Sequence, residues 1–173
     1  MSTVEAHPAI PELGTLTLAL AGLGPVAIGA LLATQTRSVE LVLIVPAMVF
    51  GVVAATTPAL YIATAATGAA PPIGRVGRAF GAALGAFGVA LVGLILPAAF
   101  LSLSSSSRTT TFVAASAALG SAAILGCWRL ERELAAGAPA KPMVSRLVFW
   151  VWAAATIGIA QGFWRELVTE VMS

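Results

Sequence analysis

The side chains that could carry out chemistry are few in this sequence. It has one histidine, His7, one cysteine, Cys127, and no aspartate. A Cys/His metal site needs more ligands than these, and hydrolysis by a serine–histidine pair or an aspartate pair lacks its base or its acid. No glutamate lies within a long apolar run, so no buried carboxylate is available to couple transport to protons. We therefore expect no enzymatic activity, no metal ion and no cofactor.

The composition is that of a membrane protein. Of the 173 residues, 59% are hydrophobic and only 9% are charged, whereas soluble domains carry about 25% charged residues. The net charge of +2 follows no basic stripe, so we expect no nucleic-acid partner. Arginine is strongly preferred over lysine, and alanine and glycine are abundant, which is typical of a GC-rich bacterial genome. These features predict a multi-pass protein of a bacterial plasma (inner) membrane.

Five long runs lack charged residues, and each is long enough to cross about 30 Å of hydrocarbon as a helix. The runs are Leu13–Ala33, Leu41–Thr67, Ala79–Leu103, Thr109–Trp128 and Leu147–Trp164. None alternates polar and apolar residues as the strands of a membrane barrel do. The sequence therefore predicts an all-α, polytopic transmembrane bundle of five spans that forms one membrane-embedded domain over residues 1–173. The second run is the longest and its bounds are the least defined.

The basic residues predict an orientation. With the N-terminus inside, the inner loops carry six basic residues, namely Arg75, Arg78, Arg129, Arg132, Lys141 and Arg146. The outer segments then carry three, namely Arg37, Arg108 and Arg165. Because loops rich in Lys and Arg stay in the cytoplasm, we expect a cytoplasmic N-terminus and an external C-terminus.

Small residues recur four apart on three of the predicted helices. The set consists of Gly77, Gly81 and Gly85, then Ala114, Ala118, Ala122 and Gly126, and finally Ala154, Gly158 and Gly162. Such spacing lets the backbones of membrane helices approach closely, which favours a tight hairpin of the third and fourth helices. The 17 glycines of the chain also produce this spacing by chance, so composition remains the alternative explanation.

Prolines and polar residues inside the spans could mark either a kink or a solute path. The candidates are Pro46, Thr56, Thr57, Pro58, Tyr61 and Gln161. A proline frees a backbone carbonyl, which transporters use to coordinate ions. Proline is also common in membrane helices for reasons of shape alone, and few polar side chains accompany it here. We favour the kink.

Charged and aromatic residues gather near the predicted helix ends. Arg75, Arg78, Arg132, Lys141 and Arg146 would face the anionic cytoplasmic leaflet, either as topological anchors or as a docking surface for a partner or a lipid headgroup. Trp128, Trp150, Trp152 and Trp164 are expected at the membrane interfaces.

The stretch from Tyr61 through Gly68, Arg75 and Arg78 to Pro97 resembles the middle of bacterial Yip1-domain proteins. The resemblance covers about a fifth of the chain. It implies five spans, a cytoplasmic N-terminus and a membrane-organising role without enzymatic activity. The long N-terminal cytoplasmic region common in that family is missing here.

We therefore expect a non-enzymatic integral membrane protein that organises other membrane proteins or serves as an accessory subunit of a larger complex. Its expected partners are the lipid bilayer and other membrane proteins or further copies of itself. The alternative is a small transporter or channel subunit for an uncharged or hydrophobic solute, with a water-accessible cavity flanked by Thr56, Thr57, Tyr61 or Gln161.

Overall fold

The computed structural model describes residues 12–66, 68, 71–105, 107–136 and 143–172. Every element in these ranges is a helix: α1 (Glu12–Thr36), α2 (Leu41–Ala66), α3 (Ile73–Ser104), α4 (Arg108–Ala135) and α5 (Met143–Met172). Each of the five is long and apolar enough to cross a membrane. The predicted all-α fold with five candidate spans is therefore confirmed. His7 and Lys141 lie outside the described residues.

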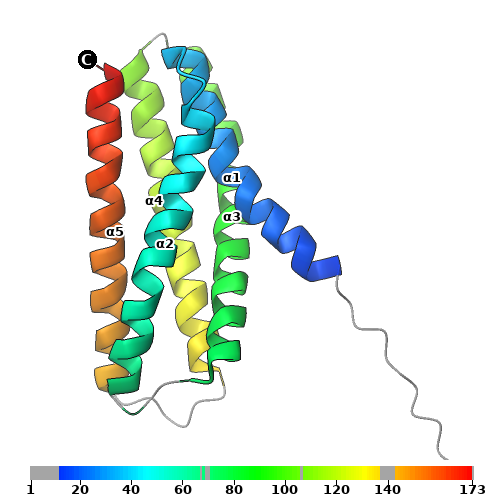
Figure 1. The fold of residues 1–173 in the computed structure, drawn as a ribbon. Coiled ribbons are helices and arrows are strands. Elements are labelled where there is room, and N and C mark those ends of the chain that lie inside the picture. Colours follow the sequence, from blue (N-terminus) through cyan, green and yellow to red (C-terminus); the bar gives the residue numbers. More distant parts are fainter. Residues whose placement is uncertain (1–11, 67, 69–70, 106, 137–142, 173) are drawn as a thin grey trace, which may run out of the picture.

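Successive helices run in opposite directions (Figure 1). We refer to the end of the bundle at which α5 finishes as the C-terminal end. The opposite end holds the beginnings of α3 and α5 and the end of α4, and we refer to it as the basic end. Its described basic residues are Arg75, Arg78, Arg129, Arg132 and Arg146.

All the helices except α2 extend beyond the predicted spans, and the extensions of α3 and α5 change the place of particular residues. α3 begins directly after Pro72, whose carbonyl accepts hydrogen bonds from the amides of Arg75 and Val76. Proline suits the entry of a helix because the first amides have no partner within the helix. Arg75 and Arg78 are therefore on a helix, whereas the sequence placed them in a loop. α5 continues to Met172, so Trp164 lies well inside it.

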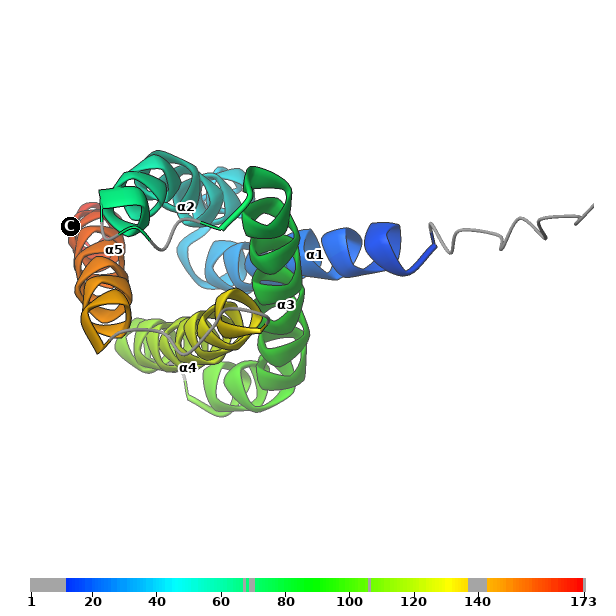
Figure 2. The ribbon, with the colours of Figure 1, turned by 90° about the horizontal axis from the view of Figure 1, so that it is seen from below.

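α1 crosses the bundle obliquely. Figures 1 and 2 show its second half between the other helices, while its first turns lead away from them. The crossing with α3 is close, because a Cβ atom on Gly88 would collide with the backbone of Leu20 and Ala21. A Cβ atom on Gly24 would lie 3.0 Å from the side chain of Leu91. Glycine at these positions lets the two backbones approach directly.

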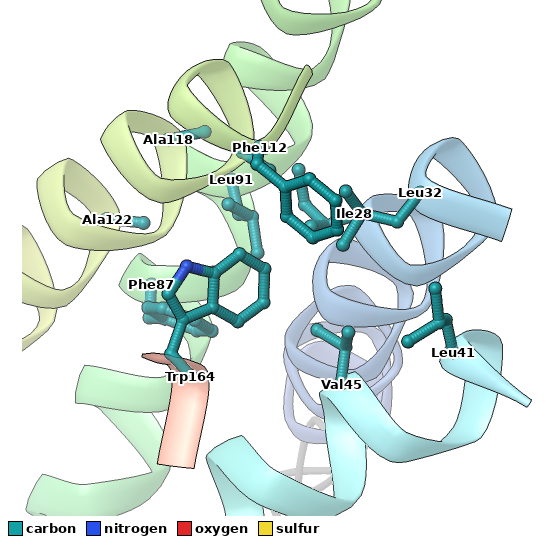
Figure 3. Close-up of a cluster of buried hydrophobic side chains, with 11 residues drawn as sticks. Ile28, Leu32, Leu41, Val45, Phe87, Leu91, Phe112, Ala118, Ala122 and Trp164 are labelled. Atoms are coloured by element: carbon teal, nitrogen blue, oxygen red, sulfur yellow. The ribbon is translucent and has the colours of Figure 1, made fainter. Parts of the chain in front are cut away.

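The core has two parts. The first lies toward the C-terminal end, where α1 enters (Figure 3). Its buried residues are Ile28, Leu32, Leu41, Val45, Phe87, Leu91, Phe112, Ala115, Ala118, Ala122 and Trp164. The second lies toward the basic end and lacks α1; its buried residues are Leu60, Ala79, Ala83, Leu130, Leu134, Phe149 and Ala153. The same four helices, α2 to α5, contribute to both.

Candidate functional site

A groove of about 680 Å³ runs along the inside of α4 and α5. α2 and α3 form its floor, with Met48 and Val52 from α2 and Ala83 and Phe87 from α3. These floor residues are buried or half-buried, whereas Val113 of α4, which also lines it, is 62% exposed. Further exposed lining residues are Gly120 of α4 and Ile157 and Gln161 of α5. The mouth of the groove therefore lies between α4 and α5 and opens to the side of the bundle.

The lining of this α4–α5 groove is overwhelmingly apolar. Arg165, near the C-terminal end, is the one charged side chain among its described lining residues, and Thr109 and Thr169 lie at the same end. Neither a carboxylate nor an imidazole is among the described groups that line it. Within the part of the chain that the structure describes, no group of three His, Cys, Asp or Glu residues could hold a metal ion.

The groove is long. On α5 its lining extends from Trp152 to Thr169, which corresponds to about 26 Å at ~1.5 Å per residue. The hydrocarbon core of a bilayer is about 30 Å thick, so the groove extends over most of that thickness.

Two tryptophans of α5 hold the walls of the groove together. The Trp164 indole Nε1 donates a hydrogen bond to Ser116 Oγ of α4 at 2.8 Å. The Trp152 indole Nε1 donates to the Thr56 carbonyl of α2, also at 2.8 Å. The Trp164 ring belongs to the core and is 8% exposed, so it packs inside the bundle, and its predicted position at a membrane interface stays a prediction. In a hydrocarbon environment an indole N–H needs a partner, and Ser116 supplies it.

The small residues predicted for packing are distributed unevenly. Ala114, Ala118, Ala122 and Gly126 of α4 are all buried, and a Cβ atom on Gly126 would lie 3.3 Å from that of Phe87 and 3.4 Å from the Ala83 carbonyl of α3. In α3, Gly85 is buried, but a Cβ atom on Gly77 or Gly81 would meet open space. In α5, Ala154, Gly158 and Gly162 are exposed, and the space beside both glycines is open.

The residues predicted for a kink or a solute path do not come together. The hydroxyls of Thr56 and Thr57 donate to the carbonyls of Val52 and Val53 in their own helix. α2 continues through Pro46 and Pro58, and Tyr61 is half-buried. Of the whole set, only Gln161 lines the α4–α5 groove.

Most of the described arginines at the basic end have local partners. Arg75 Nη1 donates to the Ala136 carbonyl at 3.2 Å, beside the end of α4. Arg146 pairs with Glu131 at 3.0 Å, which joins α5 to α4. Arg129 pairs with Glu133 one turn further along α4 at 2.6 Å, and Arg132 lies over the Trp128 ring at 4.7 Å. Arg78 is exposed.

No family model matches this chain, and no curated protein or solved structure is detectably similar to it. The resemblance to Yip1-domain proteins therefore stays a prediction. The sequence alternative expected a cavity near Thr56, Thr57, Tyr61 or Gln161, and of these only Gln161 lines the groove. The course of the groove along α4 and α5 was not predicted, because each helix that lines it presents ordinary apolar residues. The only signal was Gln161, a polar residue in the middle of an apolar run.

Proposed function

We propose that this chain is a non-enzymatic integral membrane protein that holds a hydrocarbon chain of a membrane-soluble molecule in the α4–α5 groove. The length and the lining of the groove carry this proposal, because its wall of mostly apolar residues extends for about 26 Å along α5, as an extended hydrocarbon chain requires. Pockets for small ligands have about 300–1,000 Å³, and this groove lies in that range. The sideways mouth gives access from the bilayer. This develops the alternative expected from the sequence, a protein that handles a hydrophobic solute.

Photo-crosslinking tests this proposal. The full chain is reconstituted in vesicles that contain a phospholipid with a diazirine at the middle of one acyl chain. After illumination we expect the label on groove residues of α4 and α5 in excess of the exposed outer residues of the same helices. Labelling that is uniform around the perimeter of the bundle would contradict the proposal.

A matched pair of glycine variants sharpens the experiment. Gly120 lines the groove and Gly93 of α3 does not, yet a Cβ atom at either position would meet open space. Gly120→Leu should therefore fill part of the groove and reduce its labelling, whereas Gly93→Leu should leave it unchanged. Equal labelling of both variants at the groove would count against binding there.

We further propose, as a second function, that the chain serves as an accessory subunit to which a transmembrane helix of another protein binds. The outer face of α5 favours this, because Ala154, Gly158 and Gly162 are exposed and no described residue occupies the space beside the glycines. Membrane helices commonly pack against one another through faces of small residues.

Cysteines introduced at 158 and 162 should crosslink to a partner in native membranes. Crosslinks only between copies of this chain would show self-association instead, and no crosslink at all would exclude this face.

The proposed location is a bacterial plasma (inner) membrane, with the basic end in the cytoplasm and the C-terminus outside. The excess of basic residues at the basic end supports this orientation. The pairing of four of the described arginines with nearby groups favours a role as anchors of the helix ends over a role as a docking surface.

A further inference from the structure

Thr156 is a buried hydroxyl without a partner. It lies in the middle of α5, is 9% exposed and lines the α4–α5 groove. Its Oγ1 atom has no hydrogen-bond partner among the residues that the structure describes. A buried polar group without a partner destabilises the folded protein. A ligand group that enters the groove and forms a hydrogen bond with this hydroxyl would remove that cost.

Other helical hydroxyls of this chain behave differently. Those of Thr56 and Thr57 donate to carbonyls four residues earlier in α2, and Ser116 donates in the same way to Phe112 in α4. Such bonds back to the helix are the usual solution for threonine and serine in membrane helices. Ser116 and Thr169 also line the groove and follow this pattern, whereas Thr156 departs from it.

The depth of Thr156 restricts what could bind to it. On α5 it is nine residues from Arg165 and ten from Arg146, or about 14 Å and 15 Å along the helix. These distances place it near the middle of a hydrocarbon core about 30 Å thick. Charged headgroups remain at the membrane surface because the hydrocarbon core does not solvate them. The partner of Thr156 is therefore an uncharged polar group that is carried within the hydrocarbon region.

To prefer one ligand over the acyl chains of the bilayer, the groove needs a polar group on that ligand to bind. An apolar groove in a membrane is filled by the acyl chains of bulk lipids, and an apolar ligand gains little over them because both are equally apolar. A hydrogen bond to Thr156 would distinguish one chain-shaped molecule from another. A carbonyl oxygen is the simplest partner, since it accepts the hydroxyl proton and brings no donor of its own.

We propose that the α4–α5 groove selects an uncharged, chain-shaped molecule with a carbonyl oxygen part-way along its length, to which the Thr156 hydroxyl donates a hydrogen bond. This inference rests on the proposed binding of a hydrocarbon chain. It adds the chemical class of the preferred ligand, a hydrophobic ketone. Acyl chains of ordinary phospholipids can enter the groove but cannot make this hydrogen bond, because their carbonyls lie near the headgroup.

Competition between two matched probes tests the inference. The probes are n-heptadecane and its mid-chain ketone, which differ in one oxygen atom. Each competes, in vesicles containing the full chain, with the diazirine-labelled lipid for the groove. We expect the ketone to compete roughly 3- to 10-fold better than the alkane, the ratio that one hydrogen bond confers.

Two variants identify the hydroxyl responsible. Thr156→Val keeps the shape of the side chain and should reduce the ketone-to-alkane ratio to about one, with alkane competition unchanged. Thr57→Val removes a hydroxyl that is bonded within α2 and is not part of the groove lining, so it should keep the full ratio. A ratio of one in the unaltered protein, or a ratio that survives in Thr156→Val, would overturn the inference while leaving chain binding intact. If neither probe competes, the proposed function itself fails.

Discussion

Trp164 and Ser116 join α5 to α4 through a hydrogen bond of 2.8 Å that is formed inside the apolar interior of the bundle. Ser116 Oγ also donates to the Phe112 carbonyl at 2.7 Å, so the indole, the hydroxyl and the helix backbone form a continuous chain of hydrogen bonds. α4 and α5 are otherwise separated over much of their length by the groove. This bond is therefore one of the few polar connections between them.

Trp164→Phe should weaken the attachment of α5. The variant keeps an aromatic ring in the core but loses the bond to Ser116, and we expect the free energy of unfolding to fall by about 0.5–1.5 kcal/mol. Unfolding in mixed micelles of increasing SDS content measures this. Trp150→Phe is the control, because Trp150 lies outside the buried core and is 43% exposed. A loss of equal size in both variants would mean that the bond contributes nothing specific.

Gly88→Ala should displace α1. The added methyl group would collide with the backbone of Leu20 and Ala21, which cannot move away without shifting the whole helix. We expect a loss of roughly 1–3 kcal/mol in the same unfolding assay, as is typical of overpacking. Gly93→Ala, in open space on the same helix, should be neutral or more stable by up to ~1 kcal/mol because alanine favours helix. A neutral Gly88→Ala would show that α1 does not cross α3 at this point.

The ion pair of Arg146 and Glu131 should contribute little to stability. It links α5 to α4 at 3.0 Å, but the Arg146 side chain is 66% exposed. Exposed pairs typically contribute 0.2–1 kcal/mol, so we expect Arg146→Ala to cost less than about 1 kcal/mol. The loss should shrink further in high salt, because salt screens exposed charges. A large loss that does not respond to salt would indicate that the basic end is less accessible to solvent than the structure indicates.

The orientation can be tested by labelling single cysteines from outside intact cells. In a Cys127→Ser background, a cysteine in place of Met172, the last residue of α5, should react with a membrane-impermeant maleimide. A cysteine in place of Gly68, in the connection at the basic end, should react only after the cells are opened. The reverse pattern would refute the proposed placement of the basic end in the cytoplasm.

The helices could be predicted from the sequence, but the way in which they pack together could not. Runs such as Leu41–Thr67 are uniformly apolar, and this property alone predicts a spanning helix, here found as Leu41–Ala66. The same uniformity hides which face of a helix packs inside, because residues that face lipid are as apolar as those in the core. Gly81 and Gly88 look alike in the sequence, yet only Gly88 meets another backbone.

Thr156 illustrates the same limit for the site. Its neighbours in the sequence resemble those of Thr56, and nothing local indicates that one hydroxyl is bonded within its helix and the other is not. That Thr156 lines a groove depends on contacts between residues distant in the sequence, such as the hydrogen bond from Trp152 to the Thr56 carbonyl.

The sideways mouth of the groove has a consequence for how occupancy would be controlled. A molecule that reaches the groove through the gap between α4 and α5 arrives by lateral diffusion in the membrane and does not cross an aqueous phase. Its mole fraction among the surrounding lipids, rather than its dissolved concentration, then determines how much protein is loaded. A protein of this kind would report on the composition of its own membrane and would be insensitive to the same compound supplied in water until that compound had partitioned.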